Sequence, residues 1–307
     1  MALAPNLHAM EVKVIGNTLI MSGPVVGDEY AKVKYAFMTN PSIDLAILRN
    51  SHGGDAKTGY RVGEFFRERG ITTAVSGFCI SSCSRMFLGG KRRLFTDDYP
   101  AQRTYIGFHG HYNNNNLNSQ SVNALGLYDW ILKYSDGKAD EALVKRWINI
   151  ERASGMVAFM HPDLALKQNY STFFCEGTEQ VRPIGCEPLK ETNAIDRGIA
   201  TETLLIASPD QNTLPEKLRA KEFPASGYAQ LSDVSKVPLV PAAGIENYKK
   251  FLTSNSPKAF AVSYSKQVWA WNAGNENANE LALQRCADRA KETCFLYAVD
   301  ELVVFKN

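Results

Sequence analysis

The chain has 307 residues, of which 45% are hydrophobic and 21% are charged, and this balance is typical of a soluble globular protein. Its 34 Lys and Arg residues nearly balance 32 Asp and Glu residues, and the basic residues form no stripe with interleaved aromatics, so we expect no nucleic-acid partner. No apolar run approaches the roughly 20 residues of a membrane-spanning helix, so we expect no membrane span.

The first half of the chain alternates predicted strands and helices. In order, the patterns predict a β-hairpin over 11–25, a helix over 27–40, a buried strand over 43–51, a helix over 52–70, a strand over 71–77, a short helix over 81–90 and a strand over 103–113. This order is typical of an α/β protein with a parallel sheet and helices packed on it.

The second half is less regular. A polar loop at 113–120 precedes helices predicted near 120–135 and 139–154, an insertion at 163–190, a helix over 191–202 and a strand over 203–207. Residues 208–245 contain many prolines and predict a linker or an extended arm. The remaining residues, 246–307, predict strands, a helix and a final strand. We therefore expect a large domain over 1–207, an arm over 208–245 and a small α/β domain over 246–307.

The six cysteines stand in three close pairs: Cys79 and Cys83, Cys175 and Cys186, and Cys286 and Cys294. An even count in local pairs predicts disulfides and an oxidising compartment, with buried thiols in a cytosolic protein as the alternative. None of the pairs has the spacing of a structural zinc site, so we expect no metal of that kind. The start of the chain lacks the features of a signal peptide.

Three predicted strand ends carry residues suited to acyl transfer. Ser81 and Ser82 stand where a strand gives way to a helix, and the positive end of the helix dipole and free backbone N–H groups favour an oxyanion there. A serine at a helix start is usually only a cap. However, His109 closes the next strand of the parallel sheet, and Gly53 and Gly54 follow another, where backbone N–H groups can approach a ligand closely. Together these ends predict a nucleophile, a base and an oxyanion site.

The segment "LRNSHGGDAKTGYRVGEFFRERGITTAVSGFCISSCSRMFLGGKRRLF…YIGFHGHYN" resembles the core of the Clp protease proteolytic subunit, within the Clp/crotonase superfamily. The shared order is a glycine pair, a helix, a strand, a serine in a small-residue helix start, a glycine stop and a strand ending in histidine. The chain looks closer still to bacterial periplasmic Clp-like proteins whose serine lies between two cysteines. The resemblance spans about residues 12–207. It implies a Clp/crotonase-like parallel sheet of ββα units, a serine peptidase without a cofactor, a peptide or protein substrate, a homo-oligomer and a periplasmic or secreted location.

Carried over by position, the resemblance implies Ser81 as nucleophile and His109 as base. It implies the N–H groups of Ser82 and Gly54, or less favourably Gly53, as the oxyanion hole. Asp163 is the nearest match for the acid of the triad, and a helix cap is its alternative role.

Several alternatives stay open. Asp97 and Asp98 are weaker candidates for the acid. His111 and His109 share a strand face and could bind a metal with His161 or Asp163, although a polar surface strand is the simpler interpretation. A bonded Cys79–Cys83 pair would stabilise the turn that carries Ser81.

The sequence thus supports two functions of different classes. The first is a serine hydrolase, a peptidase with a Ser-His-Asp arrangement. The second is a catalytically weak or inactive Clp-like binding or assembly protein of the bacterial envelope, which is favoured by departures from the family pattern such as His52 before the glycines and Arg85 on the nucleophile helix. An acyl-thioester enzyme of the crotonase kind is a third possibility, but it fits the serine and histidine less well.

Overall fold

The computed structural model describes residues 9–164, 170–179, 183, 186–211, 223–238, 241–254, 257–263, 265–274 and 278–306. The chain divides into two compact units. Unit 1 comprises Met1–Gly177 and Leu189–Gln211, and unit 2 comprises Thr178–Pro188 and Asn212–Asn307. The boundary predicted at 245/246 falls inside helix α8 (Ala242–Thr253), so the predicted arm is not wholly a linker. Its residues 212–222 and 239–240 lie outside the described residues.

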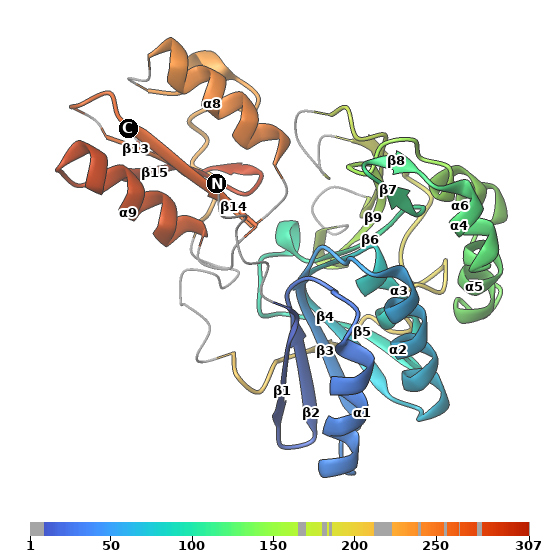
Figure 1. Cartoon of the computed structure of the whole chain (residues 1–307). Helices are drawn as coiled ribbons and strands as arrows, with labels where there is room; N and C mark the ends of the chain where they lie inside the picture. Colours follow the sequence, from blue (N-terminus) through green and yellow to red (C-terminus); the bar gives the residue numbers. More distant parts are fainter. Residues whose placement is uncertain are drawn as a thin grey trace. The chain divides into compact units, whose positions relative to one another are not determined.

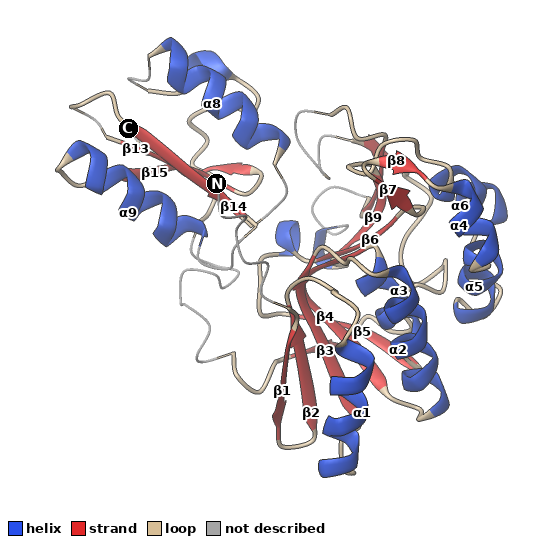
Figure 2. Ribbon diagram, viewed as in Figure 1, coloured by secondary structure: helices blue, strands red, loops and turns tan. Residues whose placement is uncertain are grey.

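Unit 1 is a mixed α/β fold built on a large, mostly parallel sheet (Figures 1 and 2). The strands of unit 1 are β1 (Glu11–Ile15), β2 (Thr18–Ser22), β3 (Leu45–Ser51), β4 (Thr72–Ile80), β5 (Arg92–Thr96), β6 (Tyr105–Phe108), β7 (Tyr112–Asn113), β8 (Asn116–Leu117), β9 (Met156–Met160), β10 (Thr172–Cys175) and β12 (Leu205–Ile206). Of these, β7 and β8 form a separate two-stranded sheet. The helices of unit 1 are α1 (Glu29–Thr39), α2 (Ala56–Glu68), α3 (Ser82–Gly89), η1 (Ala101–Arg103), α4 (Ser119–Ala124), α5 (Leu127–Tyr134) and α6 (Glu141–Ile148).

Strand β4 is the centre of this sheet and changes its neighbour along its length. Its first half, Thr72–Val75, pairs in parallel with β5, and its last three residues, Phe78–Ile80, pair in parallel with β6. Gly77 lies between the two halves with φ +70°, and a Cβ there would lie 2.0 Å from Asn50 Oδ1. Because β3, β4 and β6 are parallel, their carboxyl ends meet at one edge of the sheet.

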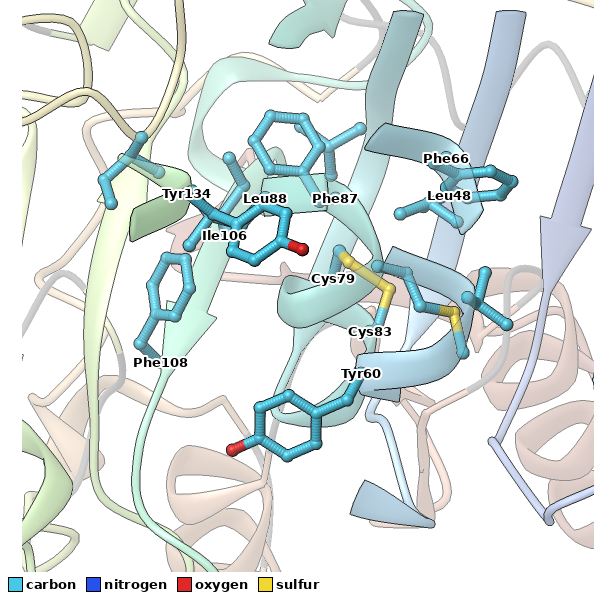
Figure 3. Close-up of a cluster of buried hydrophobic side chains, with 14 of the residues drawn as sticks. Leu48, Tyr60, Phe66, Cys79, Cys83, Phe87, Leu88, Ile106, Phe108 and Tyr134 are labelled. Atoms are coloured by element: carbon cyan, nitrogen blue, oxygen red, sulfur yellow. A yellow bond between two sulfur atoms is a disulfide. The ribbon is translucent and has the colours of Figure 1, made fainter. Parts of the chain in front are cut away.

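One face of the sheet carries the main hydrophobic core. Cys79 and Ile106, which are partners on β4 and β6, pack with Leu48 of β3 and with α2 and α3 residues such as Phe66 and Phe87, all with at most 1% exposure. Figure 3 shows this cluster around the Cys79–Cys83 bond. The opposite face carries a smaller cluster of buried aliphatic side chains from β2, β3, β4 and β5.

Helices α2 and α3 approach each other through glycines. A Cβ on Gly59 would lie 2.5 Å from Ser82 O, one on Gly63 would lie 2.6 Å from Arg85 O, and one on Gly89 would lie 2.1 Å from Gly63 O. Any side chain at these places would push the helices apart. The position of α3 is therefore set by contact between two main chains.

The structure differs from the sequence-based prediction in several places, among them strand β9, which was not predicted, and three others that have a plain physical cause. Strand β5, which opens with Arg92 and Arg93, is absent from the predicted elements because its charges hide the strand pattern. Residues 191–202 form turns and no helix, because the Asn193 side chain accepts hydrogen bonds from the backbone N–H groups of Ile195 and Asp196. The polar loop near 113–120 holds a β7–β8 hairpin whose turn residues, Asn114 and Asn115, have φ of 47° and 66°.

Unit 2 contains a four-stranded antiparallel sheet in the order β14-β13-β15-β16. Its described elements are β11 (Glu187–Pro188), η3 (Val234–Lys236), α8, β13 (Lys258–Val262), β14 (Trp269–Ala273), α9 (Ala278–Ala290), β15 (Phe295–Val299) and β16 (Leu302–Val303). Helix α8 packs on Phe260 and Tyr297, and α9 packs on Ala259 and Ala261, whose side chains alternate with that of Phe260. The sheet therefore has one helix on each face.

In the described residues, no helix combines the length and the apolar character needed to cross a bilayer.

Candidate functional site

Ser81 lies at the turn between β4 and α3, in a backbone conformation that is unusual for a residue with a side chain. It is the N-cap of α3 with φ 59° and ψ −124°. Its N–H donates to Gly107 O at 3.0 Å, and its carbonyl accepts from Ser84 N at 3.0 Å and Ser84 Oγ at 2.7 Å. The hydroxyl itself makes no hydrogen bond to any described residue, and Ser81 is half-buried. A non-glycine residue in this conformation forms a strained turn between a strand and a helix.

The glycine pair lies directly against this turn. A Cβ on Gly53, whose φ is 80°, would lie 2.7 Å from Ser81 Cβ and 2.8 Å from Ser82 N. Gly54 has φ 147°, and a Cβ there would lie 2.0 Å from Val25 O. Gly53 N–H donates to Ser51 Oγ at 3.2 Å. Among the hydrogen bonds of the described residues, none uses the N–H of Gly54 or Ser82.

His109 follows β6 at the same sheet edge. Because Ile80 pairs with Gly107, Ser81 is level with Phe108, and His109 comes one residue later. The imidazole is buried against the Tyr112 ring, with 4.9 Å between centroids, and neither ring nitrogen has a hydrogen-bond partner among the described residues. The structure therefore places Ser81 and His109 at one edge without a hydrogen bond between them.

The surroundings of His109 hold its imidazole neutral. Burial lowers the pKa of His109 to about 3, and the charges of Arg85 and His111 act in the same direction. The nearby backbone of Gly155 and Ala153 favours the protonated ring and offsets only part of this shift. A neutral imidazole can accept a proton, but this one does so weakly as it stands.

Asp163 does not lie near His109. Strand β9 is antiparallel to β6, with Met160 opposite Tyr105, and His161 N donates to Thr104 O at 2.7 Å. Asp163 therefore lies beyond the amino end of β6, whereas His109 lies beyond its carboxyl end, roughly 15 Å away at strand rise. The predicted role of Asp163 as the acid beside His109 does not fit this geometry, because an antiparallel strand carries its last residues to the opposite edge.

Asp163 instead lines a cavity of about 470 Å³ with Phe95, Met160 and Asp196. Its carboxylate is 52% exposed, and its Oδ2 lies 3.9 Å from Nδ1 of His161. Its backbone N–H donates to the same ring nitrogen at 3.2 Å. These contacts with His161 lie far from the turn that carries Ser81.

The other acids named from the sequence do not reach His109 either. Asp97 is exposed. Asp98 is buried and accepts hydrogen bonds from Ser76 Oγ at 2.7 Å and Ser208 N at 3.0 Å. It also lies 3.6 Å from Arg49 Nη2, and Arg49 makes two 2.9 Å contacts with Asp210. Hydrogen bonds from Arg49 lower the pKa of Asp210 to about 2. These charges form a structural cluster.

A hydrogen-bonded group near His109 is missing from the sequence prediction. Tyr60 Oη lies 3.1 Å from His111 Nε2, and Ser121 Oγ lies 2.9 Å from His111 Nδ1. Both ring nitrogens of His111 are thus occupied, and His161 lies at the other end of β6, so the structure does not assemble the metal set considered above. The residues come from α2, the segment after β6 and α4, and no sequence motif links them.

All six cysteines are disulfide-bonded, and none of them is free. Cys79 and Cys83 are joined with 5.3 Å between their Cα atoms, and both are fully buried. The bond, which Figure 3 draws, links the end of β4 to the first turn of α3. Ser81 lies between the two cysteines in the sequence. Cys286 and Cys294 are joined between α9 and the start of β15. Such bonds are consistent with an oxidising environment.

No family model matches the chain, and no curated protein matches it. Among solved structures, ClpP1 from Listeria monocytogenes is similar with 12% sequence identity and a TM-score of 0.39, over 64% of this chain and 94% of that chain. An asparagine-to-aspartate mutant of ClpP1 from the same organism is similar with 13% identity and a TM-score of 0.38, over the same shares of the two chains. At this identity the likeness concerns the fold and assigns no role to any residue.

Proposed function

We propose that the protein is a serine hydrolase that acts on peptide bonds. The observation that carries this proposal is the strained N-cap conformation of Ser81 between the Gly53–Gly54 loop and α3. A non-glycine residue at φ 59° and ψ −124° costs of the order of 1–3 kcal/mol, and such strain persists mainly where function requires it.

In the proposed reaction, Ser81 Oγ attacks the scissile carbonyl carbon while His109 takes the hydroxyl proton. The N–H groups of Gly54 and Ser82 stabilise the oxyanion, each worth about 3 kcal/mol. The C–N bond then breaks, and His109 returns the proton to the leaving amine. Water hydrolyses the acyl-enzyme with His109 again as base, and the enzyme is regenerated. His109 must turn toward Ser81 for this, since catalytic hydrogen bonds often form only when substrate is bound.

A second candidate is a Clp-like binding or assembly protein without turnover. The specific support is His109, which is neutral, has no hydrogen-bond partner at its ring and has no carboxylate within hydrogen-bond distance among the described residues. Both candidates are compatible with an extracytoplasmic location, which the disulfides favour. The resemblance to Clp proteases adds a homo-oligomer to the proposal, which light scattering of the pure protein tests directly.

A fluorophosphonate probe separates the two candidates. We expect the parent protein to be labelled on Ser81, with labelling lost in Ser81→Ala and reduced at least about a hundredfold in His109→Ala. Ser121→Ala is the matched control, because Ser121 is also a half-buried serine and is hydrogen-bonded to a histidine. Absence of labelling in the parent, beside a control protease that is labelled, would contradict the hydrolase and favour the binding protein.

A further inference from the structure

Arg85 is a buried cation one helical turn after Ser81. The residue is 2% exposed, and its Nη2 donates to His109 O at 3.2 Å. Its guanidinium lies over the Tyr60 ring with 5.4 Å to the centroid, and its Nε has no hydrogen-bond partner among the described residues. No carboxylate among those residues pairs with it. Burial lowers its pKa, and the groups that act on it electrostatically are Tyr60 and Tyr112.

Two other buried arginines of unit 1 each contact a carboxylate, whereas Arg85 does not. Arg49 holds Asp210 with both Nη atoms. Arg93, which is 1% exposed, contacts Asp136 Oδ2 at 3.3 Å and donates to three backbone carbonyls. Burying an arginine without an anion is costly, and these two positions follow the rule that buried charges are paired. Arg85 departs from this rule.

The titratable groups that face Arg85 from the neighbouring elements are uncharged, because burial or the charge of Arg85 disfavours their charged forms. Burial raises the pKa of Tyr60 on α2 and of Tyr112 on β7, so both phenols keep their protons. Burial and the charge of Arg85 lower the pKa of His111 to about 4, and they act on His109 in the same way. The cluster of Arg85, Tyr60, Tyr112, His109 and His111 therefore carries one uncompensated positive charge at neutral pH.

We propose that Arg85 binds the terminal carboxylate of a peptide substrate, so that Ser81 releases the C-terminal residue. This rests on the proposed function of Ser81. The guanidinium is planar and suited to a bidentate contact with a carboxylate. Arg85 follows Ser81 by four residues, about 6 Å along a helix. In a peptide, the terminal carboxylate lies about 4 Å beyond the last scissile carbonyl, a distance similar to the helical rise between Ser81 and Arg85. The N–H groups of Gly54 and Ser82 remain for the oxyanion.

A carboxylate at this place would also act on His109. Its negative charge cancels the field of Arg85 that disfavours the protonated imidazole. The substrate thereby supplies the anion that the described residues do not place beside His109. Substrates without this carboxylate would react more slowly, because Arg85 would continue to disfavour the protonated imidazole, in addition to the larger effect of burial.

Hydrolysis of three matched peptides tests the assignment. One acetylated pentapeptide has a free C-terminus, the second is its C-terminal amide, and the third is an amide with an internal Asp. We expect release of the last residue from the first peptide at least about tenfold faster than any cleavage of the other two. Equal cleavage of the amide, or preferred cleavage beside the internal Asp, would overturn the assignment to the C-terminus.

Variants at Arg85 test the residue itself. Arg85→Gln should remove the preference for the free carboxylate, and Arg85→Lys should retain part of it, because lysine keeps the charge without the fork. Arg92→Gln is the control, since Arg92 is an exposed arginine paired with Glu202. If Arg85→Gln does not fold, as judged by circular dichroism, then Arg85→Lys decides: full retention of both rate and preference contradicts the bidentate contact.

A binding measurement separates this inference from the proposed function. In Ser81→Ala, which cannot turn over, N-acetyl-dialanine should shift the His109 ring signals in NMR spectra and raise its pKa, whereas the corresponding amide should not. If N-acetyl-dialanine binds but the parent hydrolyses no peptide, Arg85 is a carboxylate-binding residue and the proposed peptidase activity is contradicted. If the parent hydrolyses peptides but N-acetyl-dialanine does not shift the His109 signals, the role of Arg85 is contradicted and the peptidase activity stands.

Discussion

Gly53 packs against Ser81 so closely that a Cβ on Gly53 would lie 2.7 Å from the Cβ of Ser81. The same Cβ would lie 2.5 Å from Ile80 O. The loop after β3 and the turn after β4 are therefore in direct contact, and this contact joins the two parts of the proposed oxyanion site.

Gly53→Ala should consequently disturb the serine turn. Besides the clash, alanine is strained at φ 80°, and we expect a loss of at least about 2 kcal/mol in unfolding free energy and at least about tenfold slower probe labelling. Gly16→Ala is the matched control, because Gly16 has φ 59° but a Cβ there would meet nothing within 4 Å. It should cost about 1 kcal/mol and leave labelling unchanged. Equal effects of the two variants on labelling would contradict the contact.

The buried His109 predicts a dependence of stability on pH. Its folded pKa of about 3 is below the unfolded value of 6.5, so the unfolded chain binds the proton more tightly. The stability is full above pH 6.5 and falls as the pH decreases from 6.5 toward 3. At a pH of about 4.5 the loss from this group is about 3 kcal/mol. His109→Gln should show a smaller loss between about pH 7.5 and pH 4.5 in urea unfolding, and a loss equal to that of the parent would refute the buried neutral state.

We predict that replacing Asp163 has little effect on probe labelling of Ser81. Because it lies beyond the opposite end of β6, Asp163→Asn should keep probe labelling within about twofold of the parent. His109→Ala should reduce labelling at least about a hundredfold under the same conditions. A loss of labelling in Asp163→Asn that matches that of His109→Ala would show that the two residues act together after all.

The cluster around Arg49 should contribute to stability through its buried charges. Arg49→Met leaves Asp98, whose side chain is fully buried, beside an apolar group, and this should cost about 3–5 kcal/mol at neutral pH. The exposed pair of Arg92 and Glu202 provides the comparison, since solvent screens such a pair and Arg92→Met should cost far less than Arg49→Met. Thermal or urea unfolding measures both, and similar losses would count against the burial argument.

The disulfide between Cys79 and Cys83 should matter more for the site than the one in unit 2. Replacing both Cys79 and Cys83 by alanine removes a short cross-link worth about 2 kcal/mol and frees the turn. We expect slower probe labelling in that variant. The double alanine variant of Cys286 and Cys294 should leave labelling intact, and equal slowing by both variants would contradict a local effect.

The sequence predicted the parts of unit 1 where periodicity is strong and the spacing short. The strand predicted over 43–51 corresponds to β3, the helix predicted over 52–70 corresponds to α2 although it begins four residues later, and Ser81 lies at a strand-to-helix turn, because local hydrophobic period and glycine stops determine them. The α/β class with a mostly parallel sheet followed from this order.

The rest depended on pairing that no local pattern encodes. Asp163 stands at a suitable distance along the chain, but only the antiparallel direction of β9 reveals that it lies at the wrong edge. Likewise Arg85 is visible as a charge on a helix, whereas its burial and its lack of a carboxylate among the described residues depend on α2, β6 and β7 together. Long-range contacts of this kind are the part that sequence reasoning could not supply.

The glycine contact between α2 and α3 has a practical consequence for every experiment described above. Because main chain meets main chain at Gly59, Gly63 and Gly89, the approach of α2 and α3 is set by backbone contact that leaves no room for a side chain at these positions. Exchanges at positions 81 and 85 alter reactivity and charge without adding a side chain to these glycine contacts. In this fold, backbone contacts between α2 and α3 help to determine where the proposed site lies, and the side chains at positions 81 and 85 determine its reactivity.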